Sequence, residues 1–154
     1  MLDDGPLTRR MPEPLLAAGF FAAATAYGAV VSIREDVPGE PLGLRVPLTV
    51  SAGVVLGWGS GLSAPWPMPA AALLVAADPH RSAGPTAGRV LAAIGAGVVT
   101  GTLIEPITWQ PQRWTPATAS AIGLNLIAAV ILIRLGRRPA AAERGGGIAG
   151  HRTA

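Results

Sequence analysis

The sequence predicts an all-α integral membrane protein in which residues 1–138 form one compact bundle of four transmembrane helices. Residues 46–77 contain no charged side chain over thirty-two positions, and three further long apolar stretches lie elsewhere. A bilayer requires about 20 consecutive apolar residues for each spanning helix. Half of the residues are apolar and only 14% are charged, against about 25% charged in soluble domains. We therefore expect the bilayer, rather than a soluble core, to cover this apolar surface.

Residues 15–33 form the first predicted span, because this apolar run is bounded by Glu13 and Arg34. The preceding Arg9 and Arg10 are interpreted as marking its cytoplasmic end. A secretory signal peptide is the alternative. The run is longer than the roughly 7–15 apolar residues of a signal core, and further spans follow it, so a span is favoured.

The second apolar stretch is too long to be one straight helix. At about 1.5 Å per residue its thirty-two residues would reach about 48 Å, whereas the hydrocarbon core is about 30 Å thick. Three prolines around Trp66 remove backbone donors and break the helix. We therefore predict a second span over 47–62, followed by a short helix over 69–77 that is interfacial or re-entrant. Trp66 is interpreted as an interfacial anchor.

The third predicted span covers 89–105 and is stopped or kinked by Pro106. Trp109 and Trp114 in the next segment are typical of residues at a membrane interface. The fourth span covers 116–135. Residues 139–154 are predicted to be a disordered basic cytoplasmic tail.

The distribution of arginine predicts the orientation. With four spans, both termini and the loop after residue 77 lie on one side and carry nine of the twelve basic residues, all of them arginine. The other side carries Arg34, Arg45 and Arg113. Because basic residues concentrate on the cytoplasmic side, we expect both termini there. Abundant Ala, Gly and Pro with no Lys is typical of a GC-rich bacterial genome, which predicts a bacterial inner membrane protein.

The composition excludes several kinds of site. The chain has no Cys, which excludes disulfides and thiolate ligands, and its two His are too few for a histidine metal cage. We predict no metal and no cofactor. The net charge of +3 is spread over loops and the tail, so we expect contacts with anionic lipid headgroups and no nucleic-acid partner. The acidic residues of 34–41 match no calcium loop and are interpreted as a solvated charge run.

Glu105 is the most informative polar residue. Ala93, Gly97, Gly101 and Glu105 recur every four positions and so share one face of the third span. The glycines would allow another helix to approach closely. A charged residue at the bilayer centre costs about 2.5–3.5 kcal/mol on insertion scales, and such residues usually face a cavity or a partner.

Counting along the spans places one polar side chain from each helix near the depth of Glu105. These candidates for a polar cavity are Tyr27, Ser51, Thr102 and Asn125. If they converge, desolvation would raise the pKa of the Glu105 carboxyl and allow proton exchange near neutral pH. In the alternative interpretation, Glu105 is solvated among headgroups near Arg113 and Asn125 only joins helices.

The second span carries a ridge of Gly53, Gly57 and Gly61, which predicts close packing within the bundle or between subunits. Three function classes follow. The sequence favours a non-enzymatic accessory or assembly subunit that acts through helix packing, with a homo-oligomer or another membrane protein as partner. The first alternative is a small carrier or pore with Glu105 as its protonatable group. The second is a membrane enzyme that acts on a lipid or another apolar substrate, with Glu105 as acid or base.

Overall fold

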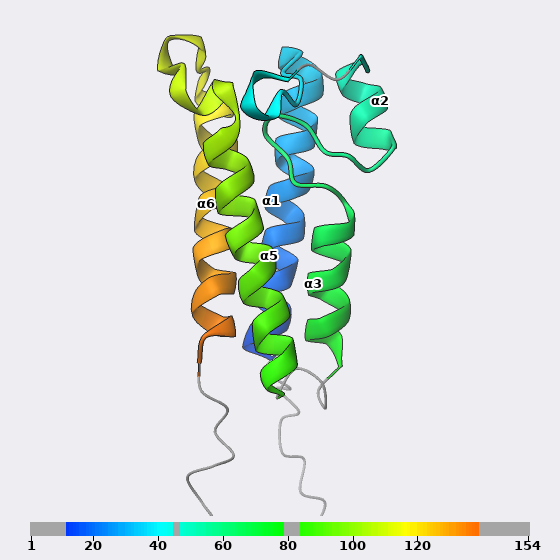
Figure 1. Cartoon of the computed structure of the whole chain (residues 1–154), viewed down its shortest axis with the longest axis vertical. Helices are drawn as coiled ribbons and strands as arrows, with labels where there is room; N and C mark the ends of the chain where they lie inside the picture. The colour runs from blue at the N-terminus through cyan, green and yellow to red at the C-terminus, as the bar shows by residue number, and fades with distance from the viewer. Residues whose placement is uncertain (1–11, 45–46, 79–83, 139–154) are drawn as a thin grey trace, which may run out of the picture.

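The computed structural model describes residues 12–44, 47–78 and 84–138, and all regular elements among them are helices. Figure 1 shows four helices side by side, namely α1 (Glu13–Glu35), α3 (Pro67–Ala77), α5 (Pro85–Ile104) and α6 (Pro116–Gly136). The smaller elements gather at one end of this bundle, and they are α2 (Val50–Val55) and the 3₁₀ turns η1 (Pro41–Gly43), η2 (Pro106–Trp109) and η3 (Pro111–Arg113).

Among the described residues, three helices have the length and apolar character of a membrane span, namely α1, α5 and α6, so the predicted four-span bundle is not confirmed. They contain 23, 20 and 21 residues, which corresponds to about 30–35 Å at 1.5 Å per residue. They overlap the predicted spans 15–33, 89–105 and 116–135, and their length and apolar character indicate a membrane protein. With 11 residues, α3 reaches only about 16 Å.

The predicted second span over 47–62 is absent, because helix α2 ends at Val55. Gly57 and Gly59 follow with φ of 85° and 84°, a left-handed conformation that glycine adopts without strain and that ends a helix. Ser60 and Ser63 then form a tight turn through two backbone hydrogen bonds of 3.1 and 3.3 Å. We call 56–66 the irregular segment. The apolar run satisfies the length of a span, but its glycines do not support a helix.

The predicted short helix over 69–77 is present as α3, but it does not lie flat at the end of the bundle. It packs against α1 and α5 with Ala72 and Ala76 buried, roughly parallel to them in Figure 1. The indole Nε1 of Trp66 donates a 3.0 Å hydrogen bond to the carbonyl of Val54 and so joins α2 to the start of α3. Helix α3 is about half as long as α1, α5 and α6, so it runs beside them over only part of their length. The irregular segment runs beside the remaining part.

The core follows from small residues packed around a few large ones. Phe21 of α1 is wholly buried and belongs to one cluster with Leu91 of α5, Leu132 of α6 and alanines of α3. Helices α5 and α6 approach most closely at glycines. A Cβ atom at Gly95 would lie 2.5 Å from the carbonyl oxygen of Ala129, so any larger residue requires the helices to separate.

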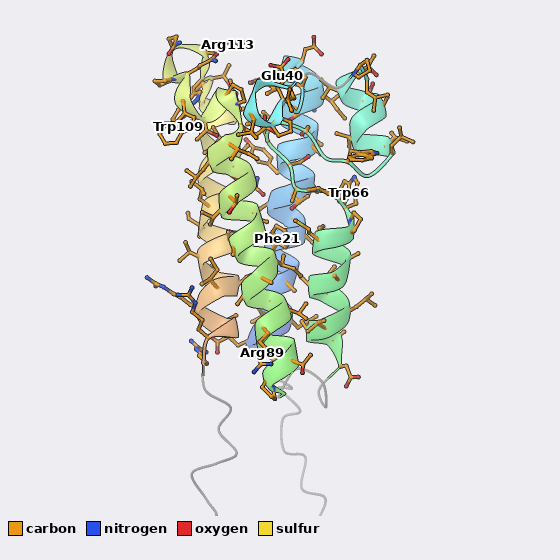
Figure 2. The ribbon with its side chains drawn as sticks, viewed as in Figure 1. Phe21, Glu40, Trp66, Arg89, Trp109 and Arg113 are labelled. Carbon is orange, nitrogen blue, oxygen red and sulfur yellow. The ribbon has the colours of Figure 1, made fainter. Side chains whose placement is uncertain are left out.

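The two ends of the bundle differ in which segments they hold. The start of α1 and the end of α6 lie at the same end, where Arg138 Nη1 and Glu13 Oε2 are 2.5 Å apart. Arg89 lies at this end in Figure 2, whereas Glu40 and Arg113 lie at the opposite end. The predicted tail over 139–154 lies outside the described residues.

Candidate functional site

A cavity of about 300 Å³ lies at the half of the bundle that α3 leaves open. We call it the inner cavity. The first turn of α3, with Met68, lines it at one side, and Pro38 and Gly39 of the loop after α1 line it at another. Its remaining walls come from α2 and the irregular segment, from α5, and from Ile122 and Asn125 of α6. The half-length helix is therefore the structural origin of the cavity.

Gly97 and Gly101 of α5 line this cavity instead of contacting a neighbouring helix closely. A Cβ atom at Gly101 would have no atom of the described residues within 4 Å, and one at Gly97 would meet only the Met68 methyl group, at 3.2 Å. The small residues predicted to permit helix packing therefore make room for the cavity. In the described part of the chain, close approach of α5 to α6 occurs at Gly88, Gly95 and Gly136.

Asn125 joins α6 to the irregular segment. Its side chain is buried, and Nδ2 donates to the carbonyl oxygens of Leu62 (3.0 Å) and Ala121 (2.9 Å). Because both of these partners are acceptors, the amide orientation is fixed. Its Oδ1 has no hydrogen-bond partner among the described residues, although Asn125 lines the inner cavity.

Glycine and serine residues hold the irregular segment against α1. A Cβ atom at Gly28 would lie 1.9 Å from the Leu62 carbonyl oxygen, so only glycine allows this close approach. The Ser60 hydroxyl donates to Ser32 Oγ at 2.7 Å and lies 2.8 Å from Ser63 Oγ. These contacts place the Leu62 carbonyl where Asn125 reaches it.

Glu105 lies at the junction of two cavities. It directly follows α5, is 9% exposed, and accepts a 3.0 Å hydrogen bond at Oε2 from the backbone N–H of Glu40. It lines the inner cavity and also a more open cavity of about 640 Å³, which we call the vestibule. The charged residues that line the vestibule with it are Asp36, Glu40 and Arg113.

The surroundings of Glu105 favour its protonated form. Burial, the largest effect, raises the pKa of the Glu105 carboxyl above its ordinary value. The hydrogen bond from the Glu40 N–H opposes this effect and lowers the pKa, whereas the negative charge of the Glu40 side chain raises it. The carboxyl can therefore change its charge in response to a ligand or to pH.

Pro106 ends α5 at this point, and side chains from η2 and the residues after it satisfy the carbonyls that it leaves free. Thr108 Oγ1 donates to the Thr102 carbonyl at 2.6 Å, and Trp109 Nε1 donates to the Leu103 carbonyl at 2.7 Å. Trp114 Nε1 donates to the Ile107 carbonyl at 2.7 Å. Trp109 and Trp114, which the sequence predicts to lie at a membrane interface, thus fix the chain around Glu105.

The structure brings three of the predicted polar residues, Thr102, Glu105 and Asn125, to the inner cavity. Tyr27 is exposed on α1, and Ser51 is exposed on α2 with its hydroxyl 3.3 Å from Thr49 Oγ1, so neither lines the cavity.

Of the predicted ridge, Gly53 and Gly61 line the inner cavity, and Gly57 forms the turn after α2. Sequence reasoning missed Trp58, Ser60, Ser63 and Glu40. The alternation of glycine with tryptophan and serine over 57–61 was an available signal, because it is unfavourable for a helix.

Comparison with models of protein families, with curated proteins and with solved structures gives no match for this chain. Within residues 12–44, 47–78 and 84–138, no group of three or more His, Asp or Glu side chains is arranged to hold a metal ion.

Proposed function

We propose that this chain is a small-molecule-binding membrane protein of the carrier class, with the inner cavity as its binding site. One observation carries the proposal: the buried Glu105 carboxyl lines both the inner cavity and the vestibule. A ligand moving between the two cavities would pass an ionisable group whose charge responds to it. Discontinuous helices beside a cavity are the usual sequence and structural pointer to a transport site in membrane proteins.

In this proposal the chain crosses a bacterial inner membrane four times. The irregular segment and α3 together make the second crossing, and irregular backbone is tolerated at membrane depth where it lines a cavity. Both termini are cytoplasmic, as the arginine distribution predicts. The vestibule therefore opens toward the outside of the cell.

An accessory or assembly subunit is the second candidate, and one observation favours it. The end of α2 and the following turn expose large apolar side chains, with Val55 83%, Leu56 63% and Trp58 76% exposed. A protein partner or a second copy of the chain would cover this surface, whereas in the carrier proposal lipid covers it. For an enzymatic role, the polar side chains that line the inner cavity with Glu105 are hydroxyls, the Asn125 amide and the Trp58 indole, and no second ionisable side chain of the described residues lines it.

Thiol labelling tests the proposal directly, because the chain has no cysteine of its own. Single cysteines at Thr102 and Ile122 report on the parts of the inner-cavity wall that α5 and α6 supply. We expect a small membrane-impermeant thiol reagent to label both from the vestibule side, in intact cells or right-side-out vesicles. A cysteine at the exposed Ser51, which does not line the inner cavity, is the positive control for access.

Filling the cavity supplies the matched comparison. Gly101→Leu places a side chain into open space within the cavity, whereas Gly19→Leu places one into open space on α1, away from it. We expect Gly101→Leu to slow labelling at Ile122→Cys at least tenfold and Gly19→Leu to leave it unchanged. Absence of labelling at both wall positions, with Ser51→Cys labelled, would contradict the proposal and favour the assembly subunit.

A further inference from the structure

We infer that the inner cavity binds an apolar primary amine in its ammonium form, with the ammonium group between Glu105 and Asn125. This inference rests on the proposed function and names the class of ligand. It follows from three independent features of the cavity: an acceptor without a donor, the sign of the charge along the entry route, and the size and apolar character of the walls.

The first feature is the amide oxygen of Asn125. Its residue is 4% exposed, and Oδ1 accepts no hydrogen bond from the described residues, although Nδ2 makes two. A buried acceptor without a donor is unfavourable and needs an explanation. Because the two carbonyl partners prevent the amide from flipping, Oδ1 can be satisfied only by a group that donates a hydrogen bond. An ammonium group supplies three donors.

The second feature is the sign of the charge. Among the described residues, the route into the cavity includes the carboxylates of Asp36, Glu40 and Glu105 and one cation, Arg113. Arg113 lines the vestibule only, and no cationic side chain of the described residues lines the inner cavity. Clefts lined mainly by one sign of charge concentrate ligands of the opposite sign. A carboxylate ligand would meet repulsion at Glu105, whereas an ammonium ion would pair with it.

The third feature is the wall. Between the polar ends, apolar side chains from three elements line the cavity, including Val50 of α2, Val98 of α5 and Ile122 of α6. The volume of about 300 Å³ holds roughly ten non-hydrogen atoms at about 30 Å³ each, the share of one water molecule in the liquid. The ligand body is therefore a short alkyl chain or a single aromatic ring.

Binding of such a ligand exchanges one proton. When the ammonium ion approaches a protonated Glu105, the carboxyl releases its proton to water and remains as the carboxylate paired with the ligand, which keeps its own three N–H protons. Of the described charged groups, Glu40 acts directly on Glu105, and Asp36 and Arg113 line the vestibule with it. Burial and the negative charge of Glu40 raise the pKa of Glu105, and the Glu40 N–H hydrogen bond lowers it, so any proton that the free carboxyl holds is the one that the ligand displaces.

Three compounds with the same phenyl-alkyl body separate the alternatives: 2-phenylethylammonium, n-propylbenzene and 3-phenylpropionate. Each is tested for protection of the Ile122→Cys protein against thiol labelling, in the full chain reconstituted in lipid nanodiscs. We expect 2-phenylethylammonium to protect at a free concentration at least tenfold lower than either of the others. Glu105→Gln should remove this preference, and Glu13→Gln, an exposed carboxylate at the opposite end of the bundle that lines neither cavity, should preserve it. Release of up to one proton per bound amine, measured with a pH indicator in weak buffer, is the second readout.

Equal or better protection by n-propylbenzene or 3-phenylpropionate in the wild-type background would overturn the ligand class and leave the proposed binding function standing. This comparison needs no variant at Glu105 and so remains decisive if Glu105→Gln does not fold. If no compound protects while Gly101→Leu still slows the labelling, the ligand class is wrong. If Ile122→Cys is not labelled at all while Ser51→Cys is, the proposed function itself fails.

Discussion

The same substitution at two glycines of α5 should change stability in opposite directions. At Gly95, an alanine Cβ atom would lie 2.5 Å from the Ala129 carbonyl oxygen and 2.8 Å from Ile133 Cγ1. Ordinary contacts of this kind begin at 3.4 Å, so α5 and α6 must separate locally by up to 0.9 Å (3.4 minus 2.5). At Gly101, the added methyl group meets nothing within 4 Å.

The magnitudes follow from this geometry. Replacing glycine by alanine within a helix is favourable by about 1 kcal/mol, and this gain applies at both positions. Overpacking of a tight contact costs about 1–3 kcal/mol, and this cost applies only at Gly95. We therefore expect Gly101→Ala to raise the free energy of unfolding by up to about 1 kcal/mol and Gly95→Ala to lower it by up to about 2 kcal/mol.

Reversible unfolding of the purified protein in mixed micelles of a mild detergent and dodecyl sulfate, followed by circular dichroism, measures both values. Because the helix-propensity gain is common to the two variants, the difference between them isolates the steric cost. Gly123→Ala in α6, where a Cβ atom also has open space, is the control for a glycine outside both the α5–α6 contact and the cavity. Destabilisation by Gly101→Ala equal to that by Gly95→Ala would refute the reasoning and return Gly101 to a packing role.

Three further predictions concern polar groups of the structure. Glu35 accepts hydrogen bonds from Thr118 and Thr115 at the start of α6. Glu35→Ala should therefore lower the free energy of unfolding, measured in the same titration, by about 2 kcal/mol. An unchanged unfolding midpoint would contradict this prediction. Trp66→Phe removes the hydrogen bond to the Val54 carbonyl. The variant should lower the free energy of unfolding by about 1 kcal/mol and should speed proteolysis of the irregular segment. An unchanged cleavage rate would show that this hydrogen bond does not fix the irregular segment. Burial raises the pKa of Glu105 above its ordinary 4.5, so folding favours the protonated form, and the free energy of unfolding should fall as pH rises from 4.5 through the folded-state pKa. Glu105→Gln should flatten this pH dependence. Identical pH profiles of the wild-type and variant proteins would contradict the prediction.

The long spans could be predicted because length and apolar character are sufficient signals for a helix that crosses a membrane. Charged or proline residues mark the ends of α1, α5 and α6 in the sequence, and the structure begins and ends these helices within a few residues of the predicted bounds. The second span could not be placed by the same reasoning. Over 47–62 the apolar length suffices, but Gly57 and Gly59 adopt positive φ and end the helix, and this local preference outweighs the hydrophobic pattern.

The sequence predicts how far along each helix the candidate residues lie, but it does not predict which face of the helix each side chain occupies. Counting residues along the helices placed Glu105 and Asn125 in one layer, and both line the inner cavity. The same count placed Tyr27 in that layer, yet its side chain lies on the exposed side of α1. Depth follows from the rise per residue, whereas the face that a residue presents depends on which neighbours the helix has. The sequence does not say which helices pack against α1, and in the structure these are α6, α3 and the short α2 rather than a second full-length span.

The half-length α3 and the polar groups beside it are explained by one requirement. Irregular backbone at membrane depth must satisfy its polar groups within the protein, because hydrocarbon offers no partners. The Ser60–Ser63 turn pairs its own backbone groups, and the turn leaves the Leu62 carbonyl for a donor from another helix. Asn125 is that donor. Its single amide group therefore completes the irregular segment through Nδ2, while Oδ1 accepts no hydrogen bond from the described residues in a side chain that lines the cavity. Asn125→Leu should accordingly destabilise the irregular segment and also weaken amine binding. Glu105→Gln should weaken amine binding with a smaller effect on the stability of the irregular segment. The two residues can therefore be distinguished by comparing binding with stability in each variant.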